Sequence, residues 1–510
     1  MPDPPHRASS RNLLVICSDE HDPRYMGVSG DARVRTPNLD ALAARGTRFE
    51  RAWTPSPICV PARAAMATGR HVHQCGYWDN AIAYEGRITS WHHRLAVAGV
   101  RVESIGKLHF RREGDPTGFV AQHEAMHIHE GIGLVWGSVR DPLPETRGRS
   151  PIFDEMGAGS SSYNRYDDRI ATLAEQWLGE RAAEGNERPW ALFAGFVAPH
   201  MPLVVPREFL EHHLERRSAF KQHPADGYRR HPWTQRMARF WDHDAELGSH
   251  DRRVLARACY LGLVEWLDVQ VGRLLKVLAD TGLDRSTTVV YTSDHGDNLG
   301  ARGLWNKSVL YRESTGVPMI VAGPGVPAGR VHRTNVSLID LYPTALDACG
   351  VSRLPEEAGL PGRSLLEMAT EEDDASRLGF SEYHAVGADG GAFMVCDGRF
   401  KYHHYVRYAP ELFDLEEDPE ELNDLAGDVG MRHQLRLMED QLLQMLDPVQ
   451  VDAAALRDQR DLIARFGGRD RAWRRGNPGP TSTADKYRMT LVRRSAADTE
   501  TETKQQGGIA

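Results

Sequence analysis

Three short apolar runs of this chain each end in polar residues. The runs are residues 12–17, 190–197 and 287–292, and they lead into Asp19 and Glu20, into His200, and into Asp294 and His295. Unbroken apolar runs of this length are typical of strands that are buried on both faces of a parallel sheet. In open α/β sheets, ligands bind at the carboxyl ends of such strands. The pattern therefore predicts a parallel sheet with a functional site along one edge.

Helical patterns separate these runs. Residues 167–183 and 252–283 carry apolar side chains close to the 3.6-residue period of an amphipathic helix. A fourth apolar run follows at residues 317–322. Alternating strands and helices indicate an α/β fold, with a large mixed but mostly parallel sheet sandwiched between helices.

The length of the chain suggests more than one unit. At 510 residues it is long for a single hydrophobic core. Near residues 350–378 the composition becomes charged and loop-like, and strand-like runs follow at 392–395 and 400–406. We therefore expect a flexible N-terminus (1–10), a large α/β domain (11–374), a smaller C-terminal α+β domain (375–470) and a tail (471–510) that is either disordered or bridges subunits.

Composition excludes several classes of protein. The net charge of −9 argues against a nucleic-acid-binding protein, although it leaves room for a small anionic ligand in a basic pocket. The polar, proline-rich N-terminus does not resemble a signal peptide, and no stretch is apolar enough to span a membrane. The five cysteines other than Cys59 are expected to be buried, reduced thiols. We expect a cytoplasmic protein.

The segment from Cys59 to Gly69 predicts a short helix with a functional N-terminus. Pro61 lies near its start and Gly69 just beyond its end, as helices prefer. Cys59 would then lie where unpaired N–H groups and the helix dipole attract anions. Arg63, one turn later, would share its face. A tetrahedral oxyanion fits such a place.

Other polar residues complete a set of candidates. The pairs Asp19-Glu20 and Asp294-His295 would converge on one metal ion if their strands were neighbours, and otherwise Asp19 and Glu20 are solvated acids. Lys107 and His109 share a face if that segment is extended, and a cation beside an imidazole suits an anion site. His200 could donate a proton to a leaving alkoxide, and Lys307 could reach the same pocket.

The order of these candidates resembles that of the type I sulfatases, a family within the alkaline phosphatase superfamily. The shared features are Asp19, C-x-P-x-R at 59–63, Gly-Lys-x-His at 106–109, Pro-His-x-Pro at 199–202, Ser-Asp-His-Gly at 293–296, and Lys307. The string at 411–425 is similar to the family's closing motif. The resemblance covers roughly residues 10–430 and implies an alkaline-phosphatase-like fold.

The resemblance also implies roles for the matching positions. A formylglycine-generating maturase would oxidise Cys59 to Cα-formylglycine, whose hydrated form attacks sulfur, expels the alcohol and is regenerated as sulfate leaves. The implied roles are metal ligation by Asp19, Asp294, His295 and the oxygen of residue 59, orientation of the aldehyde by Arg63 and His109, sulfate binding by Lys107 and Lys307, and protonation of the leaving group by His200. Ca²⁺ is the expected metal, with Mn²⁺ or Mg²⁺ as alternatives.

Two positions depart from the family pattern. Glu20 occupies the place of a ligand that is usually Asp, or Gln in some branches, so its extra methylene puts its role as a metal ligand in question. The second motif, which usually begins Gly-Tyr-x-Ser/Thr, reads Gly-Val-Arg-Val at residues 99–102. We expect residues 99–102 to support the fold more than the chemistry.

The branch of the family decides the substrate. The segments around Asn80, Lys107 and Asp294 look like those of the choline sulfatases and phosphonate monoester hydrolases, in which an Asn at this place faces the transferred group. Phosphonate hydrolases tend to have Tyr and Thr where this chain has Lys107 and His109. We therefore predict a sulfatase for a small sulfate monoester, with a phosphonate monoester or phosphodiester hydrolase as the alternative. A non-catalytic protein on this scaffold is disfavoured, because every expected position is filled.

Three histidines and the oligomeric state remain outside this set. His123, His127 and His129 do not have the spacing of a standard metal site, so we expect them in a loop or in the wall of a substrate pocket. Relatives in this branch often associate through C-terminal extensions, so the resemblance implies a homo-oligomer.

Overall fold

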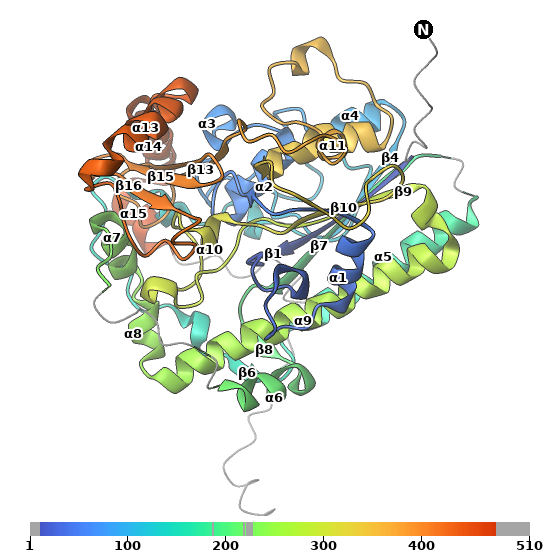
Figure 1. The fold of residues 1–510 in the computed structure, drawn as a ribbon, viewed down its shortest axis with the longest axis horizontal. Helices are drawn as coiled ribbons and strands as arrows, with labels where there is room; N and C mark the ends of the chain where they lie inside the picture. The colour runs from blue at the N-terminus through green and yellow to red at the C-terminus, as the bar shows by residue number, and fades with distance from the viewer. Residues whose placement is uncertain (1–10, 186–187, 218–219, 221–227, 476–510) are drawn as a thin grey trace, which may run out of the picture.

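The structure, a computed structural model, describes residues 11–185, 188–217, 220 and 228–475 (Figure 1). The predicted flexible N-terminus at residues 1–10, and residues 476–510 of the predicted tail, lie outside the described residues.

An eight-stranded sheet forms the centre of the molecule. Its strands, in spatial order, are β11 (Arg330–His332), β2 (Gly46–Phe49), β10 (Met319–Ala322), β9 (Thr287–Ser293), β1 (Asn12–Asp19), β7 (Trp190–Pro199), β4 (Arg101–Lys107) and β5 (Ala121–Met126). Strands β9, β1, β7, β4 and β5 are mutually parallel, whereas β10, formed by the fourth apolar run, is antiparallel to both of its neighbours. The predicted fold class, a mixed and mostly parallel sheet, is confirmed.

Helices cover both faces of this sheet (Figure 1). On one face lie α1 (Pro37–Ala44), α5 (Ser162–Ala183) and α9 (His250–Thr281), and on the other α2 (Cys59–Thr68), α4 (Trp91–Val97) and α11 (Leu341–Ala348). Alternate residues of β1 enter two separate cores, since Leu13 and Val15 pack under α2, α4 and α11 while Leu14 and Ile16 pack under α5 and α9. The unbroken apolar run thus reflects a strand covered on both sides.

The two long helices begin earlier than their apolar patterns predict. The hydroxyl of Ser161 accepts a hydrogen bond from the backbone N–H of Asn164 at the start of α5, and Ser249 caps α9 in the same way. Because a capping side chain satisfies an otherwise unpaired N–H, the helix can begin before the amphipathic stripe does. Gly282, in the left-handed conformation with a φ of 73°, ends α9.

A second, antiparallel sheet follows the first in sequence. It consists of β13 (Gly379–Tyr383), β14 (Ala392–Cys396), β15 (Phe400–Tyr405) and β16 (Glu411–Asp414), and the helices after it are α13 (Arg432–Met445), α14 (Pro448–Arg465) and α15 (Arg469–Arg474). The strand-like runs predicted at 392–395 and 400–406 correspond to β14 and β15. Two small sheets pair β12 (Val336–Ser337) with β3 (Ala52–Trp53) and β6 (Met156–Ala158) with β8 (Leu203–Val205).

The remaining α-helices are short. They are α3 (Val72–Cys75), α6 (Arg207–Glu215), α7 (Pro232–Phe240), α8 (His243–Leu247), α10 (Arg312–Thr315) and α12 (Leu365–Met368). All six cysteines are buried and none forms a disulfide. Within the described part of the chain, no helix has both the length and the apolar character that crossing a bilayer requires.

Candidate active site

Four neighbouring strands deliver polar residues to one edge of the central sheet. Strands β9, β1, β7 and β4 are adjacent and parallel, so their carboxyl ends lie side by side. The residues that follow or end them are Asp294 and His295, Asp19 and Glu20, His200, and Lys107. The pairs Asp19-Glu20 and Asp294-His295 were predicted to converge only if their strands were neighbours. The sheet order meets this condition, because β1 and β9 are adjacent.

Helix α2 points its N-terminus at this edge. Cys59 is the first residue of α2, Pro61 the third, and Gly69, with a φ of 66°, ends the helix as predicted. The Sγ atom of Cys59 lies 3.2 Å from Nε2 of His295 and 3.8 Å from Oδ1 of Asp19. Burial raises the pKa of the Cys59 thiol to about 12, so the thiol is uncharged at neutral pH.

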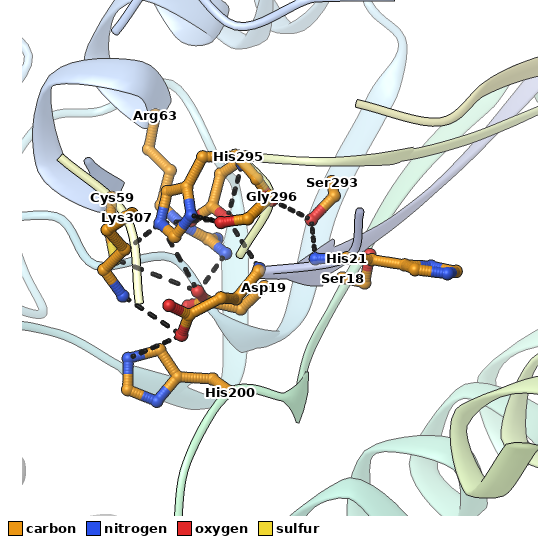
Figure 2. Close-up of polar contacts among 12 residues, drawn as sticks. Ser18, Asp19, His21, Cys59, Arg63, His200, Ser293, His295, Gly296 and Lys307 are labelled. Atoms are coloured by element: carbon orange, nitrogen blue, oxygen red, sulfur yellow. Dashed lines mark hydrogen bonds and ion pairs between the residues drawn. The ribbon is translucent and has the colours of Figure 1, made fainter. Parts of the chain in front are cut away.

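Arg63 links the carboxylates beneath Cys59. Its Nε donates a hydrogen bond of 2.8 Å to Oδ2 of Asp294, and one terminal nitrogen lies 3.6 Å from Oδ2 of Asp19. Its other terminal nitrogen donates to the carbonyl oxygen of Lys107 at 3.0 Å. Figure 2 shows Arg63, Cys59 and His295 turned toward the carboxylate of Asp19. One guanidinium therefore ties together residues from β1, β4 and the end of β9.

The same residues form a group of metal-ligand type. One ligand atom each from Asp19, Cys59, Asp294 and His295 lies within 4.8 Å of all the others, and all four residues are buried. Nδ1 of His295 lies 3.1 Å from the carbonyl oxygen of Gly296, an arrangement that assigns the ring proton to Nδ1 and leaves the lone pair of Nε2 facing the group. Two carboxylates and one oriented imidazole fit a divalent cation.

Lys107 reaches this group from the last position of β4. Its Nζ forms an ion pair with Oδ2 of Asp19. Burial by itself would raise the pKa of Asp19, but Lys107, aided by His200, Lys307 and Arg63, holds that pKa well below its usual range. An extra residue of β5 bulges opposite Gly106, and the φ of 92° at Gly106 and its close approach to the carbonyl oxygen of Gly195 exclude a larger residue there.

This geometry makes a prediction for Gly106. In Gly106→Ala, the new Cβ would lie 2.3 Å from the carbonyl oxygen of Gly195, so we expect the free energy of unfolding to fall by about 3 kcal/mol. Gly114→Ala is the matched control, since Gly114 has a φ of 85° and open space around it, and it should cost only about 1 kcal/mol. Urea unfolding measures the free energy of unfolding of both variants. Equal losses of that free energy would contradict this account of the packing around Gly106.

His200 and Lys307 point toward the same place beside Asp19 (Figure 2), and both contact the carboxylate of Glu20. Nζ of Lys307 lies 3.2 Å, and Nε2 of His200 3.6 Å, from Oε2 of Glu20. Burial raises the pKa of Glu20 to about 8. Burial together with Lys307 holds the pKa of His200 well below its usual range. Glu20 thus contacts Lys307 and His200, and with Asp19 and His200 it forms a second group of metal-ligand type.

His109 and Asn80 complete the predicted set at its rim. The condition for Lys107 and His109 to share a face, an extended segment, is not met, because β4 ends at Lys107 and His109 adopts a φ of 57°. Burial, followed by Lys107 and Arg63, holds the pKa of His109 well below its usual range, and its Nδ1 has no hydrogen-bond partner in the part of the chain that the structure describes. Oδ1 of Asn80 accepts a hydrogen bond of 3.1 Å from the N–H of Val60.

Asp297 is a residue of this region that the sequence patterns missed. It is buried, and its Oδ1 accepts hydrogen bonds from the N–H groups of Leu299 at 2.7 Å and Asn306 at 3.1 Å. These bonds close the loop between the end of β9 and Lys307. An Asp two residues before the N–H that it binds is a known turn signal, so the local bond could have been predicted, whereas the bond to Asn306 could not.

The three histidines outside the predicted set each contact a different residue. Nε2 of His123, on β5, lies 2.6 Å from Glu103, and Nε2 of His127 lies 2.9 Å from Gln122, while His129 faces Glu130. None of them belongs to a group of metal-ligand type within the described residues.

Most of the chain matches known protein families. Residues 11–351 match the family described as Sulfatase. Residues 300–447 match the family described as N-sulphoglucosamine sulphohydrolase, C-terminal. The two matches together extend from β1 to the end of α13 and part of the segment that follows it.

Individual relatives extend the same comparison. Choline-sulfatase of Rhizobium meliloti is 31% identical over 435 residues, which cover 81% of this chain and 82% of that protein. Arylsulfatase K of Danio rerio is 29% identical over 437 residues, which cover 82% and 80%. Among solved structures, phosphonate monoester hydrolase of Agrobacterium radiobacter superposes with a TM-score of 0.68 at 23% identity, covering 88% of this chain and 96% of that one.

Proposed function

Because this chain belongs to the sulfatase family, we propose that it hydrolyses a small sulfate monoester to an alcohol and inorganic sulfate, using a nucleophile made from Cys59. One observation carries the proposal. Three cations, the buried Arg63 and Lys107 and the partly buried Lys307, surround the N-terminus of α2 and the carboxylates beside it. The site therefore combines a place for an anion with a place for a cation at a single reactive residue.

The cations and the helix terminus would bind the sulfate group. Lys107 pairs with Asp19 and Lys307 with Glu20, so each could bind a different sulfate oxygen. With Oδ1 of Asn80 engaged by the N–H of Val60, the amide NH₂ of Asn80 is left to donate to a third oxygen. Donors fixed before the substrate binds stabilise charge without further reorganisation.

Residue 59 would supply the nucleophile after maturation. A buried, uncharged thiol is a poor nucleophile, which agrees with the family's use of Cα-formylglycine made by a maturase. The hydrated aldehyde offers two hydroxyl groups, one for attack on sulfur and one for release of sulfate. Arg63, one turn along α2 from residue 59, and His109, which lies near Arg63 and Lys107, would orient those hydroxyls.

The carboxylates would hold a divalent metal ion, which we propose to be Ca²⁺. Asp19, Asp294 and His295 would bind it together with the oxygen of a matured residue 59, whereas Glu20 is engaged by Lys307. When bound, the ion would offset the negative charge of the sulfate and of the nucleophile. Arg63 would keep both carboxylates in place through its contacts with Asp294 and Asp19.

His200 would protonate the leaving alcohol. Its Nδ1 lies 2.7 Å from the carbonyl oxygen of Met201, so its Nε2 faces the site and lies 3.6 Å from Glu20. The low pKa of His200 in the free site means that the ring is neutral there. The negative charge of a bound sulfate ester would favour the protonated ring and so prepare it to donate.

A phosphonate monoester hydrolase is the second candidate. Its support is the fold shared with phosphonate monoester hydrolase of Agrobacterium radiobacter, together with a site that would serve either anion. Lys107 and His109, where such hydrolases tend to have Tyr and Thr, favour the sulfate ester.

A direct comparison of two substrates tests the proposal. The protein, co-expressed with a formylglycine-generating maturase, is assayed for kcat/KM on 4-nitrophenyl sulfate and on 4-nitrophenyl phenylphosphonate. We expect a preference for the sulfate of at least about tenfold, because the additional cation and imidazole stabilise a transferred sulfuryl group in the transition state. A preference for the phosphonate would favour the second candidate, and no turnover of either ester would contradict both.

A further inference from the structure

Helix α5 contacts the segment that carries His200 at two points. The carboxylate of Asp167 accepts hydrogen bonds from the N–H groups of Val197 at 2.7 Å and Ala198 at 2.8 Å. One turn earlier, the ring of Tyr163 lies edge-on to the imidazole of His200, with the ring centroids 6.3 Å apart. Because residues four apart share a helix face, a single face of α5 makes both contacts.

The two N–H groups that Asp167 binds lie where β7 loses its neighbours. The pairing of β7 with β4 ends at Gly195, and its pairing with β1 becomes irregular before Pro199. Val197 and Ala198 therefore donate to a side chain instead of to a strand. The N–H of His200 in turn donates to the carbonyl oxygen of Val197 at 3.0 Å. A short series of bonds thus runs from Asp167 through the turn to the backbone of His200.

Asp167 is an unusual residue for this task. It is fully buried, and no Lys, Arg or His among the described residues lies within ion-pairing distance of it. Burial raises the pKa of Asp167 to about 7, against the opposing effect of the two N–H groups. An apolar residue in its place would leave both N–H groups buried and unpaired, which costs about 1–3 kcal/mol for each group.

We propose that Asp167 is the positioning residue for His200, holding the end of β7 so that Nε2 of the imidazole meets the oxygen of the departing alcohol. The inference rests on the proposed role of His200 as the acid for that alcohol. Asp167 itself touches neither substrate nor metal ligand. Its loss should therefore affect proton donation to the leaving group and leave the binding of sulfate intact.

The dependence of rate on the leaving group tests this inference. Matured wild-type, Asp167→Asn and His200→Ala are compared on 4-nitrophenyl sulfate, which releases a stable phenolate, and on phenyl sulfate, which releases a more basic one. For Asp167→Asn we expect kcat on phenyl sulfate to fall about ten- to a hundredfold, and kcat on 4-nitrophenyl sulfate to change about twofold or less, with KM little altered. His200→Ala should show the same trend with larger losses.

The double variant and a neighbouring residue provide the controls. Adding Asp167→Asn to His200→Ala should change kcat by about twofold or less, because both changes act through one imidazole. Asp168→Asn should behave as wild type, since Asp168 is exposed and pairs with Arg273. If Asp167→Asn does not fold, Asp167→Glu retains two acceptor oxygens and should show a weaker form of the same trend.

Each possible result has one meaning. Equal losses on both substrates, or additive losses in the double variant, would overturn the positioning role. A wild-type protein that turns over neither aryl sulfate would instead defeat the proposed function, so the two failures are distinguishable.

Discussion

Replacing Cys59 by Ala should abolish turnover of aryl sulfates while leaving the fold in place. Ala offers no sulfur for maturation and no hydroxyl for attack, so we expect kcat to fall by roughly 10⁴-fold or more. The side chain is 2% exposed, and its loss from α2 should lower the free energy of unfolding by only about 1 kcal/mol. Steady-state assays on 4-nitrophenyl sulfate and thermal unfolding measure the two effects.

Two further variants sharpen the Cys59 experiment. Cys75→Ala removes a thiol of similar burial on α3 and should retain full activity. Cys59→Ser retains an oxygen but removes the thiol that the common maturase oxidises, so it should be inactive after co-expression with that enzyme. Retained activity in Cys59→Ala would refute the assignment of the nucleophile.

Removing the divalent metal ion should abolish activity and lower thermal stability together. Without a bound metal ion, the buried carboxylates of Asp19 and Asp294 lie close together, and Arg63 and Lys107 offset only part of their repulsion. After dialysis against a chelator, added Ca²⁺ should raise the free energy of unfolding by about 2.7 kcal/mol at 100 times its Kd. Thermal unfolding with and without Ca²⁺ gives this shift independently of any assay of activity.

Substitution of a single ligand separates metal binding from the ion pair. Asp294→Asn should lose both the Ca²⁺-dependent rise in Tm and the activity. The matched control is Asp340→Asn, since Asp340 is also fully buried and binds an arginine, with Arg377 at 2.6 Å. Both variants lose a buried Asp–Arg pair, at a cost of about 3 kcal/mol, but only Asp340→Asn should keep its response to Ca²⁺. A Ca²⁺ response in Asp294→Asn would remove Asp294 from the ligands.

Much of the fold could be predicted because its signals are local. The apolar runs that became β1, β7 and β9 are covered on both faces, and this double burial leaves no charged residue within them. The helix that starts at Cys59 follows from Pro61 and Gly69, whose backbone preferences act within a few residues. The antiparallel direction of β10 was not predictable, because an apolar run does not encode the orientation of its partner.

The candidate site was predictable in its residues but not in its contacts. Motif order identified Cys59, Lys107 and Lys307. A shared face for Lys107 and His109 depended on an extended segment, and β4 ends at Lys107, before His109. The engagement of Glu20 by Lys307 and His200 also escaped the patterns, since nothing near Glu20 in sequence specifies partners so distant along the chain.

By itself, the sequence determined the fold class, the position of the reactive residue at a helix start, and the residue types at the strand ends. Only the tertiary structure decided which of them meet. The order of β9, β1, β7 and β4 brings Asp294 beside Arg63 and Lys107 beside Asp19. It also places Asp167 of α5 against the end of β7. The physical reason is that strand order and helix packing depend on burial summed over the whole core, whereas periodicity and capping depend on neighbours in the chain.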